Sequence, residues 1–143
     1  AFIDTYFQQF PRVRGYIDAS IARARELGYT ETMLGRRRYL PDINASNHNI
    51  REAAERVAIN TPVQGTAADI IKIAMVRIHR ELPAAFPKAT MLLQVHDELV
   101  FEVPGEQADM FGSWAKENMS AALRLDIPLK VDAGAGKSWK EAH

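Results

Sequence analysis

The sequence contains no cysteine and no long apolar run, and it carries no net charge. The absence of cysteine excludes a disulfide framework, a thiolate zinc site and a thiol nucleophile. No apolar segment approaches the roughly 18 residues that a membrane-spanning helix needs. Basic and acidic residues balance at 18 each, so the chain cannot bind nucleic acid through bulk charge alone.

The 143 residues have the composition of one globular domain, with 47% hydrophobic and 25% charged residues. This apolar content and the zero net charge exclude disorder as the main state of the chain. Helical spacing of apolar residues is already present at residue 2, with no initiator methionine and no capping residue before it. We therefore expect the chain to be cut from a longer protein.

The pattern of apolar residues and turn residues predicts an α+β fold, in which an antiparallel hairpin and a further strand pack against long helices. A long helical pattern over residues 50–82 is interrupted by Pro62 and Gly65, which predicts a kink or two helices in tandem. The other predicted elements are helices over residues 1–9, 12–27 and 105–123, a hairpin over 29–40, a capping loop over 43–49, a strand–turn–strand over 90–103 and a last strand over 129–133.

The tripeptide His96-Asp97-Glu98 lies between two apolar runs typical of strands. A tight turn there exposes two neighbouring carboxylates, whose mutual repulsion favours a bound cation or water. Mg²⁺ prefers one or two carboxylates together with substrate phosphates. The alternative is a plain turn, in which Asp is common. A two-metal centre also needs at least one further acidic residue.

Three hydrogen-bond donors, Arg56, Asn60 and Gln64, follow one another at a spacing of four residues, which places them on one face of a helix. Every base pair in the DNA minor groove offers acceptors at purine N3 and pyrimidine O2. Such donors could hold paired DNA without reading its sequence. The alternative is an ordinary solvated helix face.

A run of three arginines at positions 36–38 lies on the predicted hairpin at 29–40. Arginines in this position suit contacts with phosphate groups, and they suit surface ion pairs equally well.

In combination, these segments resemble the C-terminal part of the family A DNA polymerases, the bacterial DNA polymerase I type. The resemblance covers essentially the whole chain, and several long motifs in the right order make chance agreement negligible. The motifs that carry it are GRRRYLPD at 35–42, REAAER at 51–56, NTPVQGTAAD at 60–69, QVHDELV at 94–100 and GKSWKEAH at 136–143.

The resemblance implies roles for the residues of these motifs. Asp97 would be a ligand of the catalytic metals, and Glu98 an accessory acid close to them. His96 and Gln94 would lie against the primer end. Glu98 matches the DNA polymerases of the family, because the related RNA polymerases usually carry Ser at this position. The residues implied to contact template, primer or nascent base pair are Arg51, Arg56, Asn60 and Gln64.

The resemblance further implies a parent enzyme that performs template-directed 5′→3′ DNA synthesis with two Mg²⁺ ions in the bacterial cytoplasm. Its partners would be primer–template DNA, deoxynucleoside triphosphates and the remainder of the polymerase chain. The family's other metal-binding Asp strand and its nucleotide-binding helix are not found in this sequence. We therefore expect a C-terminal fragment, inactive alone, with part of the fingers subdomain at 1–40 and the C-terminal part of the palm at 41–143.

Two other functions fit the same residues less completely. The first is a DNA-binding module without catalysis, which would use the polar helix face and the arginines. The second is a metal-dependent phosphoesterase built on His96, Asp97 and Glu98. It would need further acids, and Asp69 and Glu102 are the nearby candidates by sequence.

Overall fold

The chain is described by a computed structural model that covers residues 2–142. Residue 1 of the expected fingers part and residue 143 of the expected palm part therefore lie outside the described residues. Internal contacts divide the chain into two compact units, the first ending at Thr66 and the second beginning at Ala67. Each unit combines helices with one two-stranded antiparallel sheet, which confirms the α+β fold.

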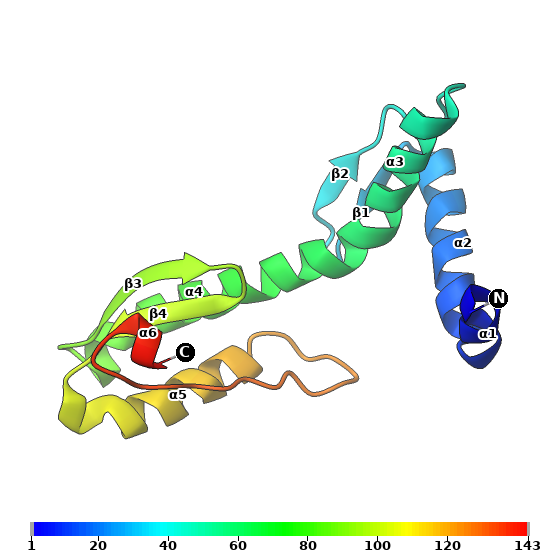
Figure 1. Ribbon diagram of the computed structural model, residues 1–143. Helices are drawn as coiled ribbons and strands as arrows, with labels where there is room; N and C mark the ends of the chain where they lie inside the picture. Colours follow the sequence, from blue (N-terminus) through cyan, green and yellow to red (C-terminus); the bar gives the residue numbers. More distant parts are fainter. Residues whose placement is uncertain (1, 143) are drawn as a thin grey trace. The chain divides into compact units, whose positions relative to one another are not determined.

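The first unit confirms the predicted order of helix, helix, hairpin and helix (Figure 1). Its hairpin strands are shorter than predicted, and they pair from Tyr29 with Tyr39 to Glu31 with Arg37. The elements are α1 (Phe2–Gln9), α2 (Pro11–Leu27), β1 (Tyr29–Glu31), β2 (Arg37–Tyr39), α3 (His48–Asn60) and η1, a π-helical turn (Thr61–Gly65).

Local sequence explains where α2 ends and how its packing brings α2 and α3 together. Gly28 adopts φ 74° and donates its N–H to the Ala24 carbonyl at 2.9 Å, which is the left-handed C-cap that glycine commonly forms. The buried residues between the helices include Ala24, Ala54 and Ala58. Because alanine side chains are small, α2 and α3 can approach closely, as Figure 1 shows.

The second unit is organised around an aromatic core. Phe111 has its ring centroid 5.2 Å from that of Phe86 and 4.9 Å from that of Phe101. These contacts join the end of α4, strand β4 and helix α5, so they fix the base of the second hairpin. The elements are α4 (Thr66–Ala85), β3 (Thr90–Val95), β4 (Glu98–Glu102), η2 (Gly105–Gln107), α5 (Ala108–Ser120) and α6 (Trp139–Ala142), the first residue of α4 belonging to the first unit.

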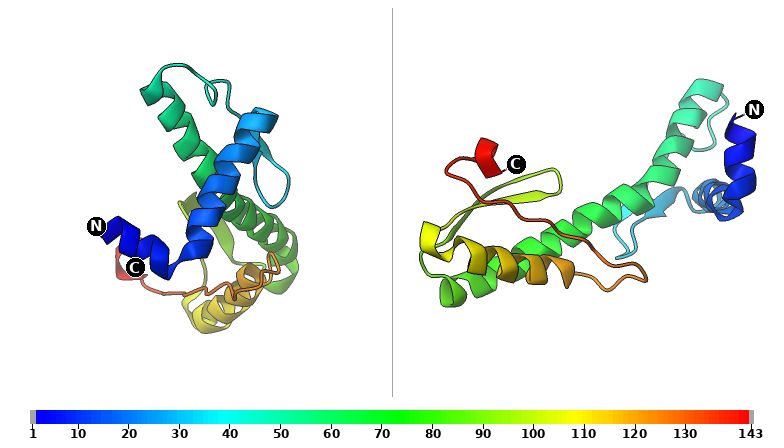
Figure 2. Two further views of the ribbon diagram at one scale, coloured as in Figure 1. Left: turned by 90° about the vertical axis from the view of Figure 1, so that its right-hand side faces the viewer. Right: turned by 60° about the horizontal axis from the view of Figure 1, so that its bottom comes forward.

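The strand predicted over residues 129–133 is wrong. Residues 129–132 do alternate between half-buried and exposed, as in a strand, but no strand of residues 2–142 pairs with this segment. A strand exists only where its N–H and C=O groups pair with a neighbour. Figure 2 shows this segment as coil between α5 and α6, and Ala133 lies beside Gly112 of α5.

Helix ends differ from the prediction at two places in the second unit. Helix α4 continues past Pro83 to Ala85, because a proline near a helix end removes only one hydrogen bond. The helix predicted over 105–123 begins as a single 3₁₀ turn and ends at Ser120. Within residues 2–142, no helix combines the length and apolar character needed to cross a membrane.

Candidate functional site

The predicted site residues fall into two sets, one in each unit, and each set is brought together on a short stretch of chain. The set in the first unit lies on α3 and η1, and the set in the second unit lies at the tip of the β3–β4 hairpin. The first set is Arg51, Arg56, Asn60 and Gln64, and the second is Gln94, His96, Asp97 and Glu98.

The tip of the β3–β4 hairpin is a two-residue turn made of His96 and Asp97, closed by the pairing of Val95 with Glu98. His96 has φ 54°, and it is the one non-glycine residue with positive φ among residues 2–142. A side chain in this left-handed region costs roughly 1–2 kcal/mol. Two-residue hairpins require positive φ, and glycine or asparagine normally supplies it. A histidine in its place marks a strained position of the kind that gathers at functional sites.

Gln94 stabilises this turn from within the hairpin. Its side-chain amide donates a hydrogen bond of 2.7 Å to the carbonyl of His96. The carboxylate of Asp97 is exposed, whereas Glu98 is half-buried at the start of β4. The turn therefore presents Asp97 to solvent on a backbone that Gln94 holds.

The carboxylates at this tip are hard oxygen donors, but they do not form a complete metal site. No group of three His, Asp or Glu residues suited to hold a metal occurs among residues 2–142. Asp69 and Glu102, the further acids considered for a phosphoesterase, therefore do not complete a cluster with the hairpin tip. A cation at Asp97 needs additional ligands from water, from substrate or from further protein.

Replacing His96 with glycine tests the strain directly. We expect His96→Gly to leave the free energy of unfolding unchanged or to raise it by up to about 1 kcal/mol, because glycine adopts positive φ without steric cost. His96→Ala keeps the strain and should give no gain. Urea denaturation of the three proteins measures the difference, and a loss above about 1 kcal/mol in the glycine variant would show that the turn is not strained.

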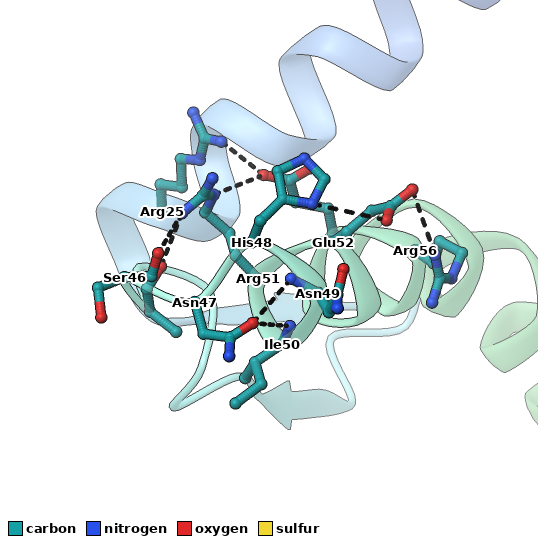
Figure 3. A network of polar contacts seen from close by, with 11 residues as sticks. Arg25, Ser46, Asn47, His48, Asn49, Ile50, Arg51, Glu52 and Arg56 are labelled. Carbon is teal, nitrogen blue, oxygen red and sulfur yellow. Dashed lines mark hydrogen bonds and ion pairs between the residues drawn. The ribbon is translucent and has the colours of Figure 1, made fainter.

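The start of α3 is fixed by Asn47, whose side-chain oxygen accepts hydrogen bonds from the N–H groups of Asn49 and Ile50 at 2.9 and 3.4 Å (Figure 3). This N-cap was expected from the polar loop at 43–49.

Arg51 is largely engaged by the protein itself. Its guanidinium donates to the carbonyls of Ala45 at 2.8 Å and Ser46 at 3.4 Å, and it lies 3.9 Å from the carboxylate of Glu55. Arg25 of α2 pairs with the same carboxylate, and Figure 3 shows Arg25 beside Arg51. The side chain of Arg51 is 31% exposed, so Arg51 ties the loop before α3 to the helix and keeps only part of its surface for other contacts.

Arg56 lies on the exposed side of α3, where its guanidinium is 3.5 Å from Glu52. Glu52 also lies 4.0 Å from a ring nitrogen of His48. With 61% of the Arg56 side chain exposed, this pair contributes less than about 1 kcal/mol, so a phosphate can replace Glu52 at small cost.

The π-helical turn after α3 changes the direction of Gln64. Each step of four residues in an α-helix drifts by about 40° around the axis, so an unbroken helix would carry Gln64 away from Arg56. A π turn rotates less per residue and cancels part of this drift. Asn60 and Gln64 are exposed, and their side-chain amides form no hydrogen bond with any residue from 2 to 142.

Comparison with known proteins decides the family. The profile described as DNA polymerase family A matches residues 1–141. The chain belongs to this family. It is 51% identical over 142 residues to the thermostable DNA polymerase I of Thermus thermophilus, covering 99% of this chain and 17% of that protein. It is 49% identical over 140 residues to DNA polymerase I of Mycobacterium tuberculosis, covering 98% and 16%.

A solved structure agrees with this assignment. The structure described as the POL domain of Pol1 from M. smegmatis, in complex with DNA primer-template and dNTP, matches with a TM-score of 0.92 and 47% identity. The match covers 98% of this chain and 25% of that one. The chain thus spans about one sixth of the length of the curated relatives it matches. Family A polymerases use divalent metal ions.

Several residues that hold the predicted site residues of this family A chain in place were not predicted from the sequence. Glu52 and Glu55 pair with Arg56 and Arg51 at a spacing of four residues, a signal that the sequence does contain. The pairing of Arg25 with Glu55 joins residues 30 positions apart, and no local pattern indicates it.

Proposed function

We propose that this chain is part of a DNA-directed DNA polymerase that performs template-directed 5′→3′ DNA synthesis. One observation carries the proposal: in a family A chain, a strained two-residue turn presents Asp97 to solvent. The partners proposed are primer–template DNA, deoxynucleoside triphosphates and the remainder of the polymerase. Residues 1–40 would belong to the fingers and residues 41–143 to the palm.

Asp97 is the proposed metal ligand, with Glu98 as an accessory acid beside it. The two neighbouring carboxylates suit Mg²⁺, which keeps several waters and binds through one or two carboxylates plus substrate phosphates. Mg²⁺ held at Asp97 would supply stabilisation of the charge that develops in nucleotidyl transfer. Gln94 donates to the His96 carbonyl, so it holds the backbone from which the Asp97 side chain projects. His96 and Gln94 are proposed to lie against the primer end.

The helical set is proposed to hold the DNA. Arg56 binds DNA after giving up its exposed pair with Glu52, and Asn60 and Gln64 donate hydrogen bonds to minor-groove acceptors. These acceptors occur at every base pair, so the hydrogen bonds stabilise correctly paired DNA whatever its sequence. Arg51 adds the remaining exposed part of its guanidinium to the same surface.

Primer extension by the complete polymerase tests the proposal. With primer–template, four nucleotides and Mg²⁺, we expect incorporation dictated by the template and abolished by a chelator. A protein that binds the duplex but extends nothing would be a DNA-binding module. A protein in which this chain is the only metal-binding part, and which shortens the primer or template, would be a phosphoesterase. Binding without extension and shortening of the DNA would each contradict the proposal.

Removing the charge of Arg56 should weaken DNA binding in a salt-dependent way. We expect Arg56→Ala to raise the Kd for primer–template about threefold to tenfold at low salt and to reduce the slope of log K against log salt by about one. Arg14→Ala is the matched control, because Arg14 is 59% exposed and also pairs with an acid four residues away, Asp18. Fluorescence anisotropy across a salt series measures both slopes, and an unchanged slope for Arg56→Ala would remove Arg56 from the phosphate contacts.

A further inference from the structure

Side chains from other elements donate hydrogen bonds to backbone carbonyls at and beside the π-helical turn Thr61–Gly65. Pro62 has no N–H, so the Ala58 carbonyl lacks its usual partner four residues later. The hydroxyl of Thr30, on β1, donates to that carbonyl at 3.2 Å in a buried position. The hydroxyl of Tyr16, on α2, donates to the next carbonyl, that of Ile59, at 2.8 Å. Two distant hydroxyls therefore stabilise the entry into the turn.

The second half of the turn is held in the same manner. The Thr66 hydroxyl donates to the carbonyl of Pro62 and accepts from the N–H of Met33 at 3.0 Å. Arg36 donates to the carbonyl of Gly65 at 3.0 Å. A Cβ at Gly65 would lie 2.6 Å from the Cγ2 of Thr32, so the hairpin reaches the turn only because this residue is glycine.

Packing alone does not hold the turn on the side of Tyr16. A pocket of about 260 Å³ lies there, and its lining includes Tyr16, Thr30 and Pro62. An open space beside the proline leaves room for the turn to shift, because no dense layer of side chains opposes the movement. On the side of Tyr16, the position of the turn therefore depends on these hydrogen bonds more than on close packing.

We propose that the hydroxyl groups of Tyr16 and Thr30 are positioning groups for Gln64. This inference rests on the proposed function, in which Gln64 donates to the minor groove of the nascent base pair. By satisfying the Ala58 and Ile59 carbonyls, the two hydroxyls favour the π turn over a regular helix broken at Pro62. The π turn keeps Gln64 near the line of Arg56 and Asn60. Tyr16 and Thr30 thus act on fidelity through Gln64, without contacting DNA themselves.

The experiment is a double-mutant cycle in the complete polymerase, with single-nucleotide incorporation measured for matched and mismatched nucleotides. We expect Tyr16→Phe to lower kcat/KM for matched nucleotides about threefold to tenfold, the range that one neutral hydrogen bond supports. Mismatched incorporation should change less, so discrimination should fall. In the Gln64→Ala background, Tyr16→Phe should change kcat/KM less than about twofold.

Matched variants separate positioning from general loss of stability. Thr30→Val removes the second hydroxyl at constant shape and should reproduce the effect of Tyr16→Phe. Tyr29 lines the same pocket, and its hydroxyl bonds to no residue from 2 to 142, so Tyr29→Phe should leave incorporation unchanged. A melting curve for each variant confirms that it is folded.

The outcomes distinguish the inference from the function on which it rests. If Gln64→Ala has no effect, the proposed role of Gln64 is wrong. If Gln64→Ala lowers discrimination but Tyr16→Phe and Thr30→Val are silent, or are fully additive with it, the role of Gln64 stands and the positioning role is overturned.

Discussion

Replacing Asp97 with alanine in the complete polymerase is expected to slow nucleotide incorporation by about a thousandfold or more. Divalent metal supplies several kcal/mol of transition-state charge stabilisation, and each 1.36 kcal/mol corresponds to about a tenfold change in rate. Asp97 is the exposed carboxylate of the strained hairpin turn, so its removal takes away a ligand while leaving the backbone intact. DNA affinity should remain within about threefold, because the proposed DNA contacts lie mainly on α3 and η1.

Rapid-quench incorporation and an anisotropy titration measure the two quantities separately. Asp126→Ala is the matched control, since Asp126 is an exposed aspartate in coil outside the proposed site. It should leave both quantities unchanged. Turnover of Asp97→Ala close to that of the unaltered enzyme would remove Asp97 from the metal site and favour a DNA-binding module.

Replacing Gln64 with alanine should reduce the efficiency of correct incorporation by about 1–3 kcal/mol, or roughly fivefold to 150-fold. The variant removes one donor and leaves an acceptor in the groove without a partner. The loss should be similar for all four template bases, because purine N3 and pyrimidine O2 occupy equivalent positions in every pair. Mismatched pairs displace these acceptors already, so their incorporation should suffer less.

Gln9→Ala offers a control of the same chemical change at an exposed glutamine of α1. Exposed substitutions of this kind stay within about 0.5 kcal/mol. Single-nucleotide incorporation over all four templates, with matched and mismatched nucleotides, measures the effect. Equal efficiencies for Gln64→Ala and the unaltered enzyme would show that Gln64 is a solvated surface residue that makes no contact with the minor groove.

The elements with strong local signals could be predicted from sequence. Asn47 and Gly28 cap helices through bonds to residues at most four positions away, so their chemistry is visible in a short window. The hairpin at His96 was likewise predicted from its two apolar strands, although Glu98 proved to be part of β4 rather than of the turn.

The strand predicted at 129–133 failed for the opposite reason. Alternation is a property of the segment itself, whereas pairing depends on a second strand elsewhere. Within residues 2–142 that second strand does not occur. Local sequence therefore indicates a capacity for strand formation and cannot supply the partner.

The contacts around the site residues also could not be predicted from short stretches of sequence. Pro62 and Gly65 predicted an interruption, but not a π turn. The hydroxyls that donate to the carbonyls just before it lie 28 and 43 residues away in the sequence, so no local pattern indicates them. In the same way, the resemblance to family A polymerases implied a DNA contact for Arg51 but gave no sign of its hydrogen bonds to the loop at Ala45 and Ser46.

Iron-directed cleavage of the complete polymerase tests most directly whether the hairpin tip holds metal. Fe²⁺ is exchanged for Mg²⁺ in the complex with primer–template and nucleotide, peroxide is added, and the cut positions are mapped by mass spectrometry. We expect cleavage of the backbone clustered at residues 96–98, and loss of these cuts in Asp97→Ala. Cleavage confined to other parts of the polymerase, with the segment 94–100 intact, would contradict the assignment of Asp97 as a metal ligand.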